Sequence, residues 1–198
     1  MGKVPVFRLS EEIARFAFEI HLRLKAKDWY ICFTNPTAGP WKKINFKLNK
    51  KTFEFARYLR EETRPDLILF NKRLKSIIII EAKDSFLGIS TAGQVEKSFK
   101  VFNKEKTRFL GSQYLPDGLK KDLTFINSFL WADENLSNFD KMKEVIGSLG
   151  FDSDPTFSII VNKSDGGLEH FGAITFEGKT VDNKKLESIF ESLNLRNV

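Results

Sequence analysis

Apolar residues recur along this chain with two periods, one typical of helices and one typical of strands. Ser10, Glu11 and Glu12 are suited to a helix N-terminus, and apolar residues then follow at helical spacing. The face that we expect to lie in the core consists of Ile13, Phe16, Ala17, Ile20 and Leu24. Residues 77–80 are consecutive isoleucines, which predicts a strand buried on both faces.

The remaining pattern alternates strands with helices. The basic segment 47–62 is predicted to be helical from Thr52, because Phe55, Tyr58 and Leu59 would share one side of a helix. We expect strands over residues 29–33, 66–70, 76–82, 123–131, 157–161 and 171–176, and helices over 91–109, 136–149 and 184–193. This order indicates an α/β fold, a mixed α+β sheet with helices on its faces. Residues 1–198 show no repeat or linker and are predicted to form a single domain.

Composition excludes several classes of site. The 198 residues, 41% of them hydrophobic, can bury a core without disulfides or a structural metal. Cys32 is the only cysteine, which excludes an internal disulfide and a thiolate zinc site, and the two histidines share no metal-ligand spacing. No segment approaches the ~20 apolar residues of a membrane span. We therefore expect a soluble, cytoplasmic protein that binds no membrane.

The charge balance favours an anionic partner. There are 32 basic and 26 acidic residues, a formal net charge of +6 at pH 7. A basic surplus is typical of proteins that bind nucleic acid, although it is not specific to them.

One segment combines several features of a catalytic site, the run from Pro65-Asp66 to Glu81-Ala82-Lys83. Asp66 opens one predicted strand, while Glu81 and Lys83 close the next. If these strands pair as neighbours, two carboxylates and an ammonium group meet at one edge of the sheet. Two carboxylates suit Mg²⁺, for which Mn²⁺ can substitute, and a lysine beside them can orient an attacking water. The alternative is a hairpin with charged ends and no further role.

Only this segment has the full arrangement. A second Glu-x-Lys sequence, at residues 177–179, has no Pro-Asp pair a strand earlier. The motif at 65–83 resembles the signature of the PD-(D/E)XK nuclease superfamily, which includes many type II restriction endonucleases. The resemblance implies a restriction-endonuclease-like core and metal-dependent hydrolysis of DNA phosphodiester bonds to 5′-phosphate and 3′-hydroxyl ends. It also implies that Asp66 and Glu81 hold the metal and that Lys83 serves the attacking water.

The same family often adds a glutamate from the N-terminal helix. Glu12 and Glu19 are seven residues apart on nearly the same helical stripe, and either could face the site. We favour Glu19, because it lies deeper in the helix between Phe18 and Ile20. A carboxylate that has no role is less favourable between apolar residues. Some branches place a glutamine on the helix after Glu-x-Lys, and Gln94 has this place, although a solvated glutamine is an equally good interpretation.

Basic residues lie on both sides of the motif. Those predicted to contact DNA phosphates are Lys42, Lys43, Lys47, Lys72 and Arg73. A solvated charged face is the alternative interpretation. No motif for reading base sequence is evident.

The sequence thus predicts a Mg²⁺-dependent endonuclease acting on double-stranded DNA in a restriction system. The enzyme would act as a homodimer or as a catalytic subunit with a larger recognition subunit. A structure-selective or repair nuclease, such as a Holliday-junction resolvase, is the second hypothesis. A catalytically inactive DNA-binding module on the same fold is the third.

Overall fold

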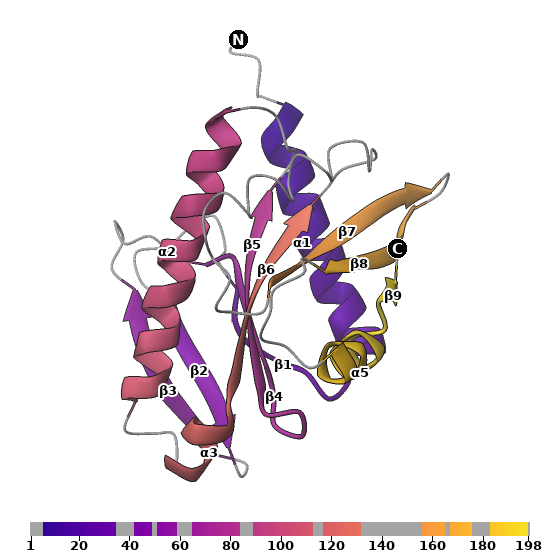
Figure 1. Cartoon of the computed structure of the whole chain (residues 1–198). Coiled ribbons are helices and arrows are strands. Elements are labelled where there is room, and N and C mark those ends of the chain that lie inside the picture. Colours follow the sequence, from indigo (N-terminus) through magenta and orange to yellow (C-terminus); the bar gives the residue numbers. More distant parts are fainter. Residues whose placement is uncertain are drawn as a thin grey trace.

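The structure is a computed structural model and describes residues 6–34, 42–48, 51–58, 65–83, 89–112, 117–131, 156–164, 167–175 and 183–197. Figure 1 shows strands flanked by helices. The helices are α1 (Val6–Lys25), α2 (Ile89–Gly111), α3 (Asp117–Asp122) and α5 (Asn183–Leu193). The strands are β1 (Tyr30–Thr34), β2 (Lys42–Leu48), β3 (Lys51–Tyr58), β4 (Leu67–Asn71), β5 (Ser76–Lys83), β6 (Thr124–Trp131), β7 (Thr156–Ser164), β8 (Gly167–Thr175) and β9 (Arg196–Asn197).

Among the described residues, the main sheet has seven strands in the order β1-β4-β5-β6-β7-β8-β9. β1, β4 and β5 are antiparallel neighbours, whereas β5, β6 and β7 run parallel. The sheet is therefore mixed, and α2 lies on the connection between the parallel strands β5 and β6. The predicted α/β fold with a mixed sheet and flanking helices is confirmed.

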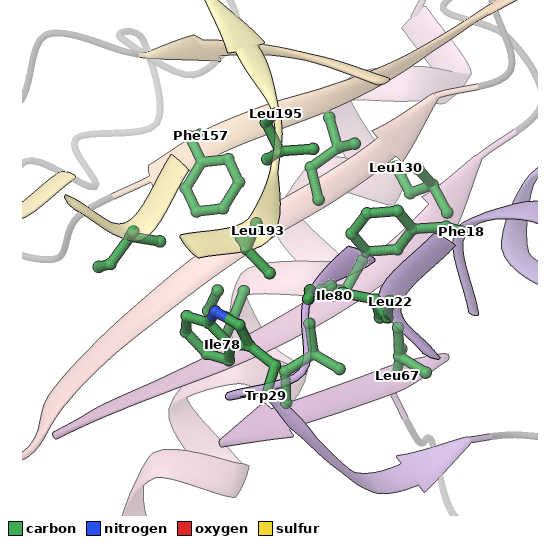
Figure 2. Close-up of a cluster of buried hydrophobic side chains, with 14 of the residues drawn as sticks. Phe18, Leu22, Trp29, Leu67, Ile78, Ile80, Leu130, Phe157, Leu193 and Leu195 are labelled. Atoms are coloured by element: carbon green, nitrogen blue, oxygen red, sulfur yellow. The ribbon is translucent and has the colours of Figure 1, made fainter. Parts of the chain in front are cut away.

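The core has two layers, one on each face of the sheet. Ile78 and Ile80 belong to a cluster with side chains of α1 and α5, including Phe18 and Leu193 (Figure 2). Ile77 and Ile79 belong to a second cluster with Phe102 and Phe109 of α2. All four isoleucines are at most 1% exposed, so β5 is buried on both faces as its sequence predicts.

The buried face of α1 is not the one that we predicted. Phe16, Ile20 and Leu24 are 54%, 57% and 65% exposed, whereas Phe18 and Leu22 are buried. Apolar residues occur on both sides of this helix, so hydrophobicity alone does not select the core face. The buried side also carries Arg15 and Glu19, whose mutual ion pair makes their burial tolerable. The helix also begins at Val6, so Ser10 lies inside it rather than at its N-terminus.

The helix predicted from Thr52 is wrong. β2 and β3 form a separate antiparallel pair in which the backbone of Phe46 pairs in register with that of Phe53. Phe53 and Phe55 alternate with Thr52 and Glu54, a period of two that indicates a strand. Both periods are present in this sequence, and pairing with β2 favours the strand over the helix. Local spacing of residues does not reveal that partner strand.

The other predicted strands and the helices over 91–109 and 184–193 are confirmed, with ends shifted by a few residues. The helix predicted over 136–149 lies outside the described residues. Among the helices in the described ranges, none has a stretch long and apolar enough to cross a bilayer.

Candidate active site

Asp66 and Glu81 lie at the same end of the β4–β5 hairpin. Leu67 pairs with Ile80 in the antiparallel register, and Asp66 precedes Leu67 while Glu81 follows Ile80. The backbone N–H of Asp66 donates to the carbonyl oxygen of Ile80 at 3.0 Å, which holds Asp66 against β5 just before the first paired residue of β4. The two carboxylates therefore come from adjacent strands at one end of the hairpin.

A hydrogen bond holds the carboxylate of Asp66 against β5. The backbone N–H of Ala82 donates to Asp66 Oδ2 over 2.8 Å. Because Ala82 follows Glu81, this contact keeps the Asp66 carboxylate beside the backbone that carries Glu81. Asp66 is half-buried and Glu81 is 8% exposed. Carboxylates in such positions need hydrogen bonds or a cation to offset desolvation.

Lys83 is the last residue of β5, two residues beyond Glu81 at the same end of the sheet. Its backbone pairs in register with Trp131 at the end of β6. The Lys83 side chain lies outside the described residues, as do those of Glu12 and Gln94. The structure therefore places the backbone of the Glu-x-Lys motif beside Asp66 and leaves the position of the ammonium group a prediction.

Glu19 forms a buried polar triad with Arg15 and Thr34. Thr34 Oγ1 donates to Glu19 Oε1 at 2.5 Å, and Arg15 Nη1 donates to Thr34 Oγ1 at 3.0 Å. Arg15 Nη1 also lies 3.5 Å from Glu19 Oε1, and both side chains are at most 10% exposed. Thr34 pairs in register with Leu67, the residue after Asp66, so the triad adjoins the candidate site.

The sequence pointed to Glu19 but not to its two partners. Arg15 could have been found, because it precedes Glu19 by four residues and so shares its side of α1. Thr34 lies on another element, and only the packing of α1 against β1 brings it to Glu19. One oxygen of Glu19 is thus engaged by protein groups, which is consistent with a role in holding α1 against the sheet.

The donor chemistry of Asp66 and Glu81 fits a divalent cation with a preference for oxygen. Mg²⁺ is typically held by one or two carboxylates and keeps several waters. A carboxylate can accept at several lone pairs, so the bond from Ala82 does not exhaust Asp66. In the described part of the chain, no three Asp, Glu, His or Cys side chains form a group that could hold a metal. Among the side chains described, a cation here would therefore be held by these two carboxylates together with water.

The five basic residues predicted to bind DNA fall into two separate places. Lys72 and Arg73 lie in the β4–β5 turn, at the opposite end of the hairpin from Asp66 and Glu81. Glu81 is five positions beyond Ser76 on β5, about 17 Å at ~3.3 Å per residue. These two residues are therefore not brought together with the carboxylates. Lys42, Lys43 and Lys47 lie on β2, and their side chains lie outside the described residues.

Cys32 does not contribute to this site as a nucleophile. The residue is buried, and burial raises the pKa of its thiol to about 12. A thiol with this pKa stays protonated near neutral pH, whereas the thiolate is the reactive form.

No protein-family model, curated protein or solved structure matches the chain.

Proposed function

We propose that the chain is a metal-dependent endonuclease that hydrolyses phosphodiester bonds in double-stranded DNA, with Asp66, Glu81 and Lys83 in its active site. One observation carries the proposal: Asp66 and Glu81 lie at the same end of the β4–β5 hairpin, and the Ala82 N–H holds the Asp66 carboxylate against the strand that carries Glu81. This arrangement would offer two hard oxygen ligands to one cation.

The order of elements also supports the proposal. Apart from the separate β2–β3 pair and the short helix α3, the chain order is α1, β1, β4, β5, α2 and β6: a helix, three antiparallel neighbouring strands, a second helix and a parallel strand. The resemblance of residues 65–83 to the PD-(D/E)XK signature implies a mixed sheet with helices on its faces. The fold is compatible with that restriction-endonuclease-like core.

Each residue has a defined role in the proposed reaction. Asp66 and Glu81 would hold Mg²⁺ or Mn²⁺, and the Ala82 N–H would keep Asp66 oriented toward it. A cation in this place makes a bound water more acidic and offsets charge on the phosphate. Lys83 would orient the attacking water. The water oxygen bonds to phosphorus while the bond from phosphorus to the 3′ oxygen breaks, which leaves a 5′-phosphate and a 3′-hydroxyl.

The proposed biological role is restriction of foreign DNA. One active site cuts one strand, so a double-strand break needs two sites, which a homodimer bound to a palindromic target would supply. A catalytic subunit with a larger recognition partner is compatible with the same site. The substrate separates these roles from repair, because a resolvase would cut only branched DNA.

The test is cleavage of supercoiled, linear and branched DNA with Mg²⁺, with Mn²⁺ or with EDTA. We expect the wild type to cut only with metal. Asp66→Asn and Lys83→Ala should each lower the rate by about 10²–10³-fold, the usual cost of removing one group that stabilises a transition state.

Asp117→Asn is the matched control for Asp66→Asn. The Asp117 side chain is 90% exposed on α3, so its loss should leave cleavage unchanged. Full activity in Asp66→Asn would refute the site. Binding of duplex DNA by a wild type that cuts no substrate with either metal would favour the inactive DNA-binding module.

A further inference from the structure

A cluster of charged side chains lies at the end of the sheet opposite Asp66 and Glu81. It consists of Lys75 in the β4–β5 turn, Asp122 at the end of α3, Thr124 at the start of β6 and Lys185 in the first turn of α5. We call it the basal cluster. Figure 1 shows α3 and the β4–β5 turn together at the lower end of the molecule, where β5 and β6 begin.

An ion pair and two hydrogen bonds connect all four residues of the basal cluster. Lys75 Nζ lies 2.5 Å from Asp122 Oδ2, and Lys185 Nζ donates to Thr124 Oγ1. The backbone N–H of Thr124 donates to the carbonyl oxygen of Lys75 at 2.9 Å. Three elements that are distant in the sequence therefore bring two ammonium groups to one place.

The basal cluster contains two lysine ammonium groups and only one carboxylate, that of Asp122. Burial lowers the pKa of the Lys185 ammonium, nearby Lys75 lowers it further, and Asp122 opposes both effects. Hydrogen bonding and attraction to Lys75 in turn lower the pKa of the Asp122 carboxyl. Residues 72–75, 117–124 and 183–185 together hold seven basic and two acidic residues. Asp28 forms an ion pair with Arg73 and adds a third acidic side chain to this region. Seven basic and three acidic residues leave a basic surplus of four here, in a chain whose net charge is +6.

Two local choices in this region oppose the intrinsic preferences of the backbone. Lys75 has a φ of 48°, a left-handed conformation that costs a non-glycine residue about 1–2 kcal/mol. The first turn of α5 has no acidic residue and instead contains Lys184 and Lys185, although the helix dipole favours anions there. The lysines at the start of α5 make this surface more positive, and a bound anion would offset their repulsion from the helix dipole.

We propose that the basal cluster binds phosphate groups of a nucleic-acid backbone, as a second contact separate from Asp66 and Glu81. Lysine ammonium groups bind phosphate as compact point charges, and the Thr124 hydroxyl can add a hydrogen bond. Duplex DNA is the expected partner, a choice that depends on the proposed function. Ser76, the residue after Lys75, lies about 17 Å along β5 from Glu81, about five base pairs of duplex at ~3.4 Å each, so a duplex longer than this could reach from one end of the strand to the other.

The test is binding of a fluorescein-labelled 30-base-pair duplex in EDTA over a range of KCl concentrations. The test protein combines Lys75→Asn, which suits a left-handed residue, with Lys185→Gln. We expect the affinity to fall about tenfold and the slope of log K against log[KCl] to become shallower by about 1.8, at ~0.9 for each lost phosphate contact. Lys185→Gln alone leaves the turn intact and should change the slope by about half as much.

Two further variants control for overall charge and for folding. Lys97→Gln with Lys100→Gln removes two exposed charges from α2 and should leave binding within about twofold. Lys75→Arg with Lys185→Arg keeps both charges and should retain affinity. An unchanged slope in the test protein, or an equal loss in the α2 variant, would overturn the proposal, with thermal melts confirming that each protein is folded.

Inorganic phosphate at matched ionic strength distinguishes a backbone phosphate from a free one. If phosphate raises the melting temperature of the wild type only, and DNA binding is unchanged in the test protein, the basal cluster takes free phosphate and our assignment is wrong. The outcome is independent of catalysis. Loss of cleavage in Asp66→Asn tests the proposed function, whereas the salt slope in EDTA tests the basal cluster.

Discussion

Arg15, Glu19 and Thr34 illustrate how charged side chains can be buried in this protein. The desolvation of two ions costs several kcal/mol each and is repaid only by good geometry and additional hydrogen bonds. Here Thr34 both accepts from Arg15 and donates to Glu19, so its hydroxyl joins the two ions. Removing one charged member of the triad should therefore lower the stability of the protein, whereas replacing both charged residues by apolar ones should cost much less.

We expect Glu19→Gln to lower the free energy of unfolding by about 3–5 kcal/mol, because it leaves the Arg15 guanidinium buried without its carboxylate. The double variant Arg15→Met with Glu19→Leu should recover most of this loss. Urea denaturation of the three proteins measures both effects. If Glu19→Gln retains full stability and instead loses only metal-dependent cleavage, Glu19 belongs to the catalytic group rather than to the support of α1.

At the scale of elements, the β4–β5 hairpin and α1 set the geometry of the candidate site. The hairpin register places Asp66 and Glu81 at the same end of the hairpin, and a slip by one residue would move every side chain of a strand to the other face. α1 packs over the face that holds Ile78 and Ile80, which places Glu19 near Thr34. The candidate site thus depends on which face of α1 is buried.

Two substitutions on α1 distinguish the observed buried face from the one that its sequence suggested. Leu22 is 2% exposed, and we expect Leu22→Ala to cost about 2–5 kcal/mol, the usual range for a core leucine. Ile20 is 57% exposed, and Ile20→Lys should change stability by less than about 0.5 kcal/mol. Urea melts measure both, and a larger loss for Ile20→Lys than for Leu22→Ala would contradict the packing of this helix.

At the scale of the whole molecule, the first and last helices are joined across the same face of the sheet. His21 Nε2 donates to the carbonyl oxygen of Leu193 at 2.8 Å, and Trp29 Nε1 donates to Ser192 Oγ at the same distance. The ring of His21 also stacks on Phe18, whose side chain belongs to the same cluster as Leu193. These contacts connect α1 and its following loop to the C-terminal end of α5.

The His21 contact predicts a dependence of stability on pH. Burial lowers the pKa of His21 from its ordinary value of 6.5, Leu193 opposes the shift and Lys25 adds to it. The unfolded chain therefore takes up the proton first, so stability is full above pH 6.5 and falls as the pH drops from there through the folded pKa. We expect the melting temperature to fall more in the wild type than in His21→Gln between pH 7.5 and pH 5.5. Equal shifts in both proteins would contradict this assignment.

The sequence by itself determined the α/β class, the doubly buried strand of isoleucines and the pairing of Pro65-Asp66 with Glu81-Ala82-Lys83. These features are local, because they depend on the periods of apolar residues and on a short turn between adjacent strands. Asp66 and Glu81 come to the same end of the sheet because the two strands are separated only by the turn around Lys72 and Arg73.

Only the tertiary structure decided the features that depend on distant partners. The buried face of α1, the strands at 42–58, the triad of Arg15 with Thr34 and the basal cluster all arise from contacts between segments remote in the sequence. α1 has apolar residues on two sides, so the surface on which the helix packs determines which side is buried. Electrostatic and packing energies depend on distance in space, which a linear pattern of residues does not specify.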